Sequence, residues 1–175
     1  SARDLRLNLM SGEVDDPSQI PAIGLATKLR SSGSSPRALA SAANGAVVFT
    51  QGKGRIDNEA VGVVSGDIVA QIFSALNPFA KDETHMNWEC TVVRLDIVNG
   101  LGTLDPMVAQ AEKILITGGG TVDLRSEKLD IEFNTKPRSG VGITADGFVT
   151  PFVKIGGTLA KPGVGFNATG TLISG

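Results

Sequence analysis

The sequence predicts a mainly β fold, a mostly antiparallel sheet with two short α-helices. Apolar and polar residues alternate with period 2 in six stretches, which is the side-chain spacing of a β-strand. Most of these stretches have one apolar and one wetter face, as is typical of antiparallel sheets. Only two stretches carry clear helix signals. The alternating stretches are 5–9, 23–30, 93–97, 122–125, 129–134 and 164–168.

The first helix is expected after a run of serines. Ser35 can cap its N-terminus, and Pro36 suits the first helical position. The pattern extends to about Ala43, and Gly45 follows just past the expected end.

The second helix is expected to begin near Asp67 and to cover residues 68–76. Its apolar stripe predicts that Ile72 and Phe73 are buried against the sheet. Asn77-Pro78 ends it, because a residue before proline avoids helical geometry.

Composition excludes several classes of function. The chain has 175 residues and is expected to form a single domain, residues 1–175. Its net charge of −2 argues against a nucleic-acid-binding surface. One Cys and one His are too few for a disulfide framework or a closed structural zinc site. The sequence contains no signal peptide or transmembrane run, and both ends are strand-like, so we expect it to be part of a longer protein.

Three candidate motifs do not add up to a catalytic site. Gly118-Gly119-Gly120 lacks the lysine and following helix of a phosphate-binding loop, so a bulge or strand entry is expected. Residues 82–85 place two carboxylates beside His85, which is typical of a solvated loop. Cys90 lacks an orienting third group beside His85, and we expect a core thiol near Trp88. The expectation is a non-enzymatic chain with no cofactor and no metal.

A short unit of Gly, Thr and an aliphatic residue recurs at irregular spacing. We interpret it as a repeated strand motif, in which Thr and the aliphatic residue take opposite faces. The copies begin at Gly102, Gly120, Gly157 and Gly170.

A hairpin is expected between residues 121 and 133. A four-residue turn at 125–128 would pair Leu124 with Leu129 and Val122 with Ile131. Asp123, Asp130 and Glu132 would then occupy the opposite face.

From about residue 31 to 163 the sequence resembles the C-terminal region of the AsmA family of bacterial envelope proteins. The resemblance rests on the order of several strand-and-turn patterns. Segment 29–49 carries a Gly turn, a short helix and an Asn-Gly strand, and a helix unit ending near Leu76 follows it. In segment 88–100 a lone Cys enters a strand that closes in Asn-Gly. Segment 114–130 carries a Gly-rich strand, and segment 153–163 carries a closing Gly-Thr-Leu strand.

The resemblance implies a periplasmic β-rich module of a protein tethered to the inner membrane. It implies that the sheet curves into a groove or half-barrel, whose apolar lining serves phospholipid transport or outer-membrane assembly. It also favours strand over helix for residues 107–117. The residues expected to line the groove, or else a closed core, are Val93, Leu95, Ile97, Val122, Leu124, Leu129, Ile131 and Phe133.

Two functions stay open at this point, because a groove and a core need the same alternation. In the first, phospholipid is the partner and the apolar face is open. In the second, the chain is a structural or protein-interaction module with a closed core, and envelope proteins dock on its sheet edges. A hydrolase using Cys90 and His85 is a third, disfavoured hypothesis.

Overall fold

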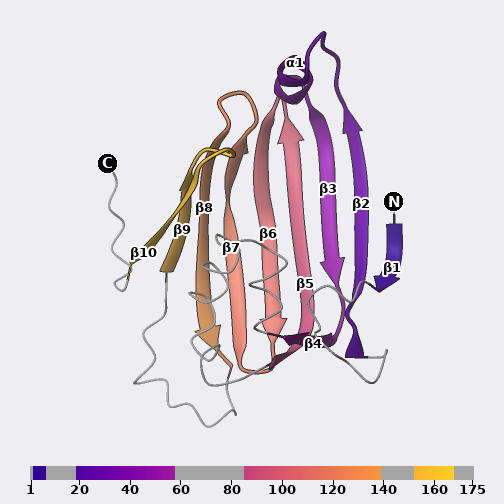
Figure 1. The fold of residues 1–175 in the computed structure, drawn as a ribbon, viewed down its shortest axis with the longest axis vertical. Coiled ribbons are helices and arrows are strands. Elements are labelled where there is room, and N and C mark those ends of the chain that lie inside the picture. Colours follow the sequence, from indigo (N-terminus) through magenta and orange to yellow (C-terminus); the bar gives the residue numbers. More distant parts are fainter. Residues whose placement is uncertain (1, 7–18, 58–84, 139–151, 168–175) are drawn as a thin grey trace.

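The described residues form a single antiparallel sheet with one short helix at one end (Figure 1). The computed structural model describes residues 2–6, 19–57, 85–138 and 152–167. The elements are β1 (Ala2–Arg6), β2 (Ala22–Arg30), α1 (Pro36–Ser41), β3 (Asn44–Gln51), β4 (Gly54–Asp57), β5 (His85–Val98), β6 (Leu101–Ala111), β7 (Ile114–Asp123), β8 (Lys128–Pro137), β9 (Phe152–Gly157) and β10 (Pro162–Asn167).

The strands follow one another across the sheet almost in sequence order. The order is β1-β2-β3-β5-β6-β7-β8-β9-β10, and β4 pairs with the start of β5. Every neighbouring pair is antiparallel, and the sheet does not close on itself. The prediction of a mainly β, antiparallel fold is therefore confirmed. Within the described ranges, no helix is long and apolar enough to cross a membrane.

Helix α1 forms where the capping signals predict it. The Ser35 hydroxyl accepts a hydrogen bond from the Ala38 backbone N–H at 3.1 Å, and Pro36 opens the helix. The helix ends at Ser41, slightly before the expected Ala43, and Ala42 caps it. The helix expected at 68–76 lies outside the described residues.

Strand β6 confirms strand over helix for residues 107–111. Asp105 and Pro106 form an irregularity in the ladder between Leu104 and Met107. Proline has no N–H to donate, so it is tolerated in a sheet at such a bulge. A turn at residues 112–113 then separates β6 from β7, so the expected strand 107–117 is two strands.

The register expected for the β7–β8 hairpin is wrong by two residues. Val122 pairs with Leu129 and not with Ile131, and Leu124 lies in the turn. The expected register would have set Asp123 opposite Asp130, two like charges. The observed register sets Asp123 opposite Lys128. The shift is by an even number of residues, so each side chain keeps its expected face.

Two copies of the Gly-Thr-aliphatic unit pair with each other. Gly102 lies opposite Val122, Thr103 opposite Thr121, and Leu104 opposite Gly120. Threonine and aliphatic residues therefore take opposite faces of the sheet, as predicted.

Candidate functional site

One face of the sheet is apolar along all of its long strands. We call it the apolar face. Partners in the ladders share a face, so the registers define its membership. Among the described residues that the ladders place on this face there is no Asp, Glu, Lys or Arg. Its large apolar members are Ile23, Leu25, Leu29, Val47, Phe49, Met86, Trp88, Val93, Leu95, Ile97, Leu104, Met107, Ile114, Ile116, Val122, Leu129, Ile131, Phe133, Val153, Ile155 and Val164.

The opposite face, which we call the charged face, carries ion pairs between neighbouring residues. Lys154 Nζ lies 3.0 Å from Asp130 and 3.5 Å from Glu132 across β8 and β9. Hydrogen bonding to Asp130, with a weaker contribution from Glu132, raises the pKa of Lys154. Half-exposed pairs of this kind contribute little to stability. Their effect is to keep this face hydrated while the other stays apolar.

The apolar face is covered unevenly. Around β6 to β9 it is closed: Val153 and Ile114 are completely buried, and Phe133 is 6% exposed. We call this part the closed half. Its buried cluster is Met86, Trp88, Ala109, Ala111, Ile114, Ile116, Phe133, Val153 and Ile155.

Toward β2 the apolar face opens to solvent. Leu25 is 40% exposed and Leu29 is 48% exposed. Phe49, the partner of Leu25 on β3, is half-buried, whereas Gly45, the partner of Leu29, is exposed. We call β2, β3 and the adjoining part of β5 the open half, lined by Ile23, Leu25, Leu29, Val47, Phe49, Val93 and Leu95.

Seven of the eight residues predicted to line a groove or core lie on the apolar face. Ile97 and Phe133 are buried, whereas the other five are half-buried. The eighth, Leu124, lies in the β7–β8 turn, where its N–H donates to the Gly100 carbonyl at 2.8 Å. The five half-buried residues are Val93, Leu95, Val122, Leu129 and Ile131.

The sequence-predicted set missed the most exposed part of this face. Residues Ile23, Leu25 and Leu29 alternate clearly in the sequence, so the signal was present. Val47 and Phe49 were harder to find, because the run 46–49 is apolar on both faces and shows no alternation.

The catalytic candidates are not brought together. His85 and Cys90 lie on the same strand five residues apart, a separation of about 17 Å along an extended chain. A nucleophile and its base must lie within hydrogen-bonding reach, so these two do not form a dyad. In the described part of the chain, no three His, Cys, Asp or Glu side chains are grouped as a metal site would require.

Cys90 is not the core thiol that we expected. A bulge at Glu89 and Cys90 separates Trp88 from Thr91. As a result Trp88 and Thr91 share the apolar face, and the Trp88 indole N–H donates to the Thr91 hydroxyl at 2.6 Å. Cys90 pairs with Gln110 on the charged face and is half-buried.

The three glycines at 118–120 lie inside β7 and not at the start of a helix. Gly119 faces the Asp105–Pro106 irregularity of β6, and the strand continues to Asp123. A phosphate-binding loop is therefore excluded here, since that loop must lead into a helix N-terminus.

Comparison of the chain with protein families, with curated proteins and with solved structures finds no match in any of the three.

Proposed function

We propose that this chain is a non-enzymatic lipid-binding module, whose apolar face lines a groove for phospholipid acyl chains. In keeping with the AsmA resemblance, it would serve phospholipid transport or outer-membrane assembly in the periplasm, as part of a protein tethered to the inner membrane. The observation that carries the proposal is the charge-free apolar face with its exposed open half.

The dimensions of the open half suit one acyl chain. From Ile23 to Leu29 the apolar side of β2 spans six residue-to-residue steps, or about 20 Å. Half the hydrocarbon thickness of a bilayer is about 15 Å. A single acyl chain could therefore lie along β2 and β3 in contact with Leu25, Phe49 and Leu29. The headgroup would then remain in water.

Exposed leucines on a sheet face need such an explanation. Single exposed apolar residues are ordinary, but contiguous apolar patches commonly mark binding sites. Leu25 lies directly opposite Phe49, which lies opposite Val93 on the next strand. The open half is thus one continuous patch across three strands.

Native mass spectrometry with lipid extraction tests the proposal. The purified chain should retain phospholipid. Leu25→Lys should remain folded by circular dichroism and lose the lipid, because a charge then lies in the acyl-chain path. The matched control is Ala26→Lys, the next residue, which lies exposed on the charged face and should keep the lipid. A wild-type chain without lipid, or equal retention by both variants, contradicts the proposal.

The closed half needs a separate comparison. Val153→Lys should unfold the domain, since Val153 is fully buried. Ile131 lies at the margin of the closed half, because its side chain is half-buried. If lipid reaches this margin, Ile131→Lys should leave a folded protein with less bound lipid. If protein closes it, the variant should unfold.

A structural or interaction module is the second candidate, and one observation favours it. Strand β1 pairs with β2 only as far as Leu25, so the outer edge from Ala26 to Arg30 has no ladder partner in the described ranges. Such an edge can accept a strand from another protein. This function would be supported instead if the wild-type chain carries no lipid and a strand from another protein, on binding, protects the Ala26–Arg30 amides from hydrogen exchange.

A further inference from the structure

The end of the sheet that carries α1 is a continuous rim of four turns. These turns, residues 31–43, 99–100, 124–127 and 158–161, join the strands on that side, and all of them lie within the described residues. We call them, with the strand ends beside them, the α1 rim. Figure 1 shows the rim at the top, where α1 sits above β3 and β5.

Backbone hydrogen bonds connect the four turns in series. Gly100 N–H donates to the Ala43 carbonyl at 2.9 Å, and Leu124 N–H donates to the Gly100 carbonyl at 2.8 Å. Leu159 N–H then donates to the Glu127 carbonyl at 2.8 Å. The rim is therefore one connected surface and not a set of independent loops.

Exposed apolar side chains concentrate on this rim. Among the described residues, seven large hydrophobic side chains are exposed, and five of them are here. They come from β2, α1, the ends of β5 and β6 beside their turn, and the β9–β10 turn. The five are Leu29, Leu39, Val98, Leu101 and Leu159.

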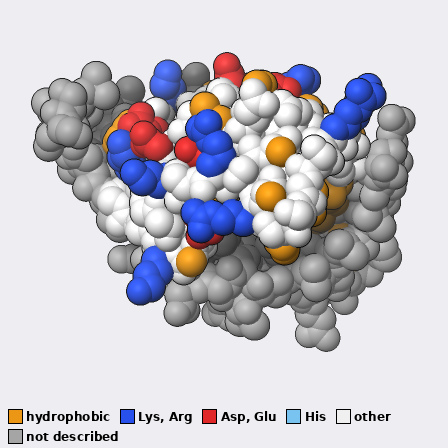
Figure 2. Space-filling view, turned by 90° about the horizontal axis from the view of Figure 1, so that it is seen from above, with side chains coloured by type: hydrophobic (Ala, Val, Ile, Leu, Met, Phe, Trp, Pro, Cys, Tyr) orange, Lys and Arg blue, Asp and Glu red, His pale blue; other side chains and the backbone are white. Residues whose placement is uncertain are grey.

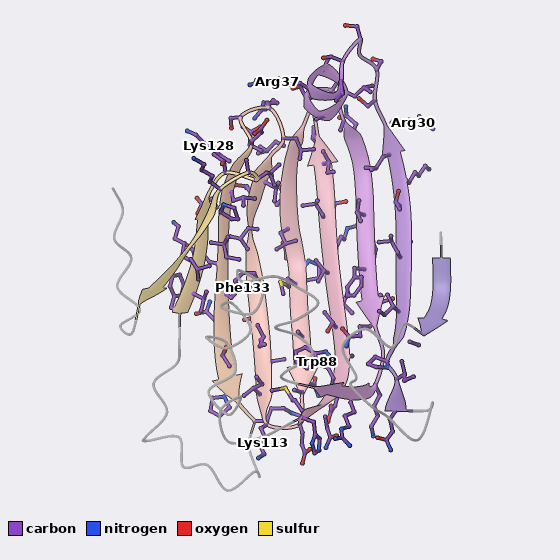
Figure 3. All side chains as sticks on the ribbon, in the orientation of Figure 1. Arg30, Arg37, Trp88, Lys113, Lys128 and Phe133 are labelled. Atoms are coloured by element: carbon purple, nitrogen blue, oxygen red, sulfur yellow. The ribbon has the colours of Figure 1, made fainter. Side chains whose placement is uncertain are left out.

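Basic side chains surround these apolar tips. The rim carries five basic and two acidic residues, a local charge of +3 in a chain whose net charge is −2. Asp123, one of the two acids, is already paired with Arg125. Figure 2, seen from above, shows Lys and Arg side chains interspersed with hydrophobic ones on this end, and Figure 3 labels three of the basic residues there. The basic residues are Arg30, Arg37, Arg125, Lys128 and Lys161.

We propose that the α1 rim docks on the surface of a membrane that contains anionic lipids. Basic residues near such a surface are attracted to the headgroups, while leucines enter the boundary of the acyl region. From β2 to β9 the apolar tips are spread over six strand spacings, about 29 Å. A fluid bilayer accommodates dispersed tips of this kind, whereas a protein partner requires a contiguous, well-packed patch. The proposal does not depend on whether the open half carries a lipid.

Vesicle flotation tests the proposal on the purified chain. The wild type should float with vesicles of phosphatidylcholine that contain about 30% phosphatidylglycerol, because an anionic surface attracts basic residues. It should not float with vesicles of phosphatidylcholine alone. Raising the salt should weaken binding, because exposed charges are screened. Arg30→Glu/Lys161→Glu should reduce partitioning about 25-fold or more, since each basic residue near the surface contributes about fivefold.

Two further variants make the test specific. Lys53→Glu/Lys136→Glu makes the same change of charge at the opposite end of the sheet and should bind as the wild type does. Leu39→Ser/Leu159→Ser keeps every charge and should still lower partitioning, by about tenfold, because apolar burial is lost. Circular dichroism checks that each variant is folded.

The outcomes separate this proposal from the groove. Leu25→Lys, which should lose bound lipid, should still float with the anionic vesicles. The docking proposal is overturned if the wild type does not float. It is also overturned if both double charge reversals weaken flotation equally, which would indicate unspecific attraction.

Discussion

The ring of Phe133 lies against Gly118, its direct partner on the neighbouring strand. A Cβ on Gly118 would come within 2.7 Å of Phe133 Cδ1, closer than real contacts allow. Phe133 is buried in the closed half, so its ring has little freedom to move away. The glycine therefore provides the space that the aromatic ring occupies, an arrangement that is favourable in sheets.

Gly118→Ala should lower the free energy of unfolding by about 1–3 kcal/mol, the usual cost of overpacking a core. Urea denaturation measures the change. Gly119→Ala is the matched control, because its new Cβ would meet nothing closer than 3.4 Å and should cost far less. Phe133→Leu combined with Gly118→Ala should cost less than the sum of the two single changes. Strict additivity would contradict the contact.

Asp123 organises the β7–β8 turn, so its charge should matter to stability. Its carboxylate accepts hydrogen bonds from the Arg125 guanidinium and from the Arg125 backbone N–H. These bonds hold the pKa of Asp123 well below its ordinary value of 3.8. Asp123→Asn keeps an acceptor for the backbone N–H and should destabilise less than Asp123→Ala.

The pH dependence of that effect has a definite sign. A carboxylate with a lowered folded-state pKa stabilises the fold above its ordinary pKa. The difference in unfolding free energy between wild type and Asp123→Asn should thus be constant from about pH 7 to 5 and shrink below about pH 4. Denaturation curves at several pH values measure it. A difference that grows on acidification would refute the pairing.

The hydrogen bond from Trp88 to Thr91 should stabilise the bulge of β5. Both residues are buried, so Thr91→Val removes an acceptor where water does not replace it and should cost about 1–3 kcal/mol. Thr91→Ser retains the hydroxyl and serves as the control. Trp88 is the only tryptophan, so its emission follows the transition directly. A Thr91→Ser variant that is no more stable than Thr91→Val would contradict a stabilising role for the Thr91 hydroxyl.

The β7–β8 register can be tested by engineered disulfides in a Cys90→Ser background. Thr121→Cys/Asp130→Cys should form a bond readily, because these residues are direct partners and their Cα atoms lie about 4.5–5.5 Å apart. Asp123→Cys/Asp130→Cys, partners in the register expected from sequence, should cross-link poorly. Mass spectrometry after mild oxidation measures both. If Asp123→Cys/Asp130→Cys cross-links more readily than Thr121→Cys/Asp130→Cys, the register expected from the sequence, with its turn at 125–128, is the correct one.

The strands were predictable wherever one face is apolar and the other is not. The placement of Val93, Ile131 and Phe133 on the apolar face followed from the period-2 alternation alone. The wrong hairpin register still placed Ile131 and Phe133 on that face. Helix α1 was equally predictable from the sequence, because Ser35 and Pro36 are local signals for the start of a helix.

Other features depend on contacts between distant segments. The Asp105–Pro106 irregularity and the Cys90 bulge change the register, and a bulge has no unique sequence signature. Three consecutive glycines in β7 present no side chains, so alternation fails there. The unequal covering of the apolar face, from Leu25 to Val153, is a property of the whole sheet and was not visible in any one strand.

The strand order allows this sheet to vary in size without redesign. Each strand from β5 to β9 pairs with its successor along the chain, so in this part of the sheet no strand lies between two strands that are distant from it in sequence. Loss of the β7–β8 hairpin would bring β6 beside β9 with strand direction preserved, whereas loss of a single strand would leave a connection at the wrong end. Because the sheet is not closed, no fixed strand number is required. Evolutionary insertions and deletions should therefore come in steps of two strands. Each step widens or narrows the apolar face by about 10 Å, measured across the strands.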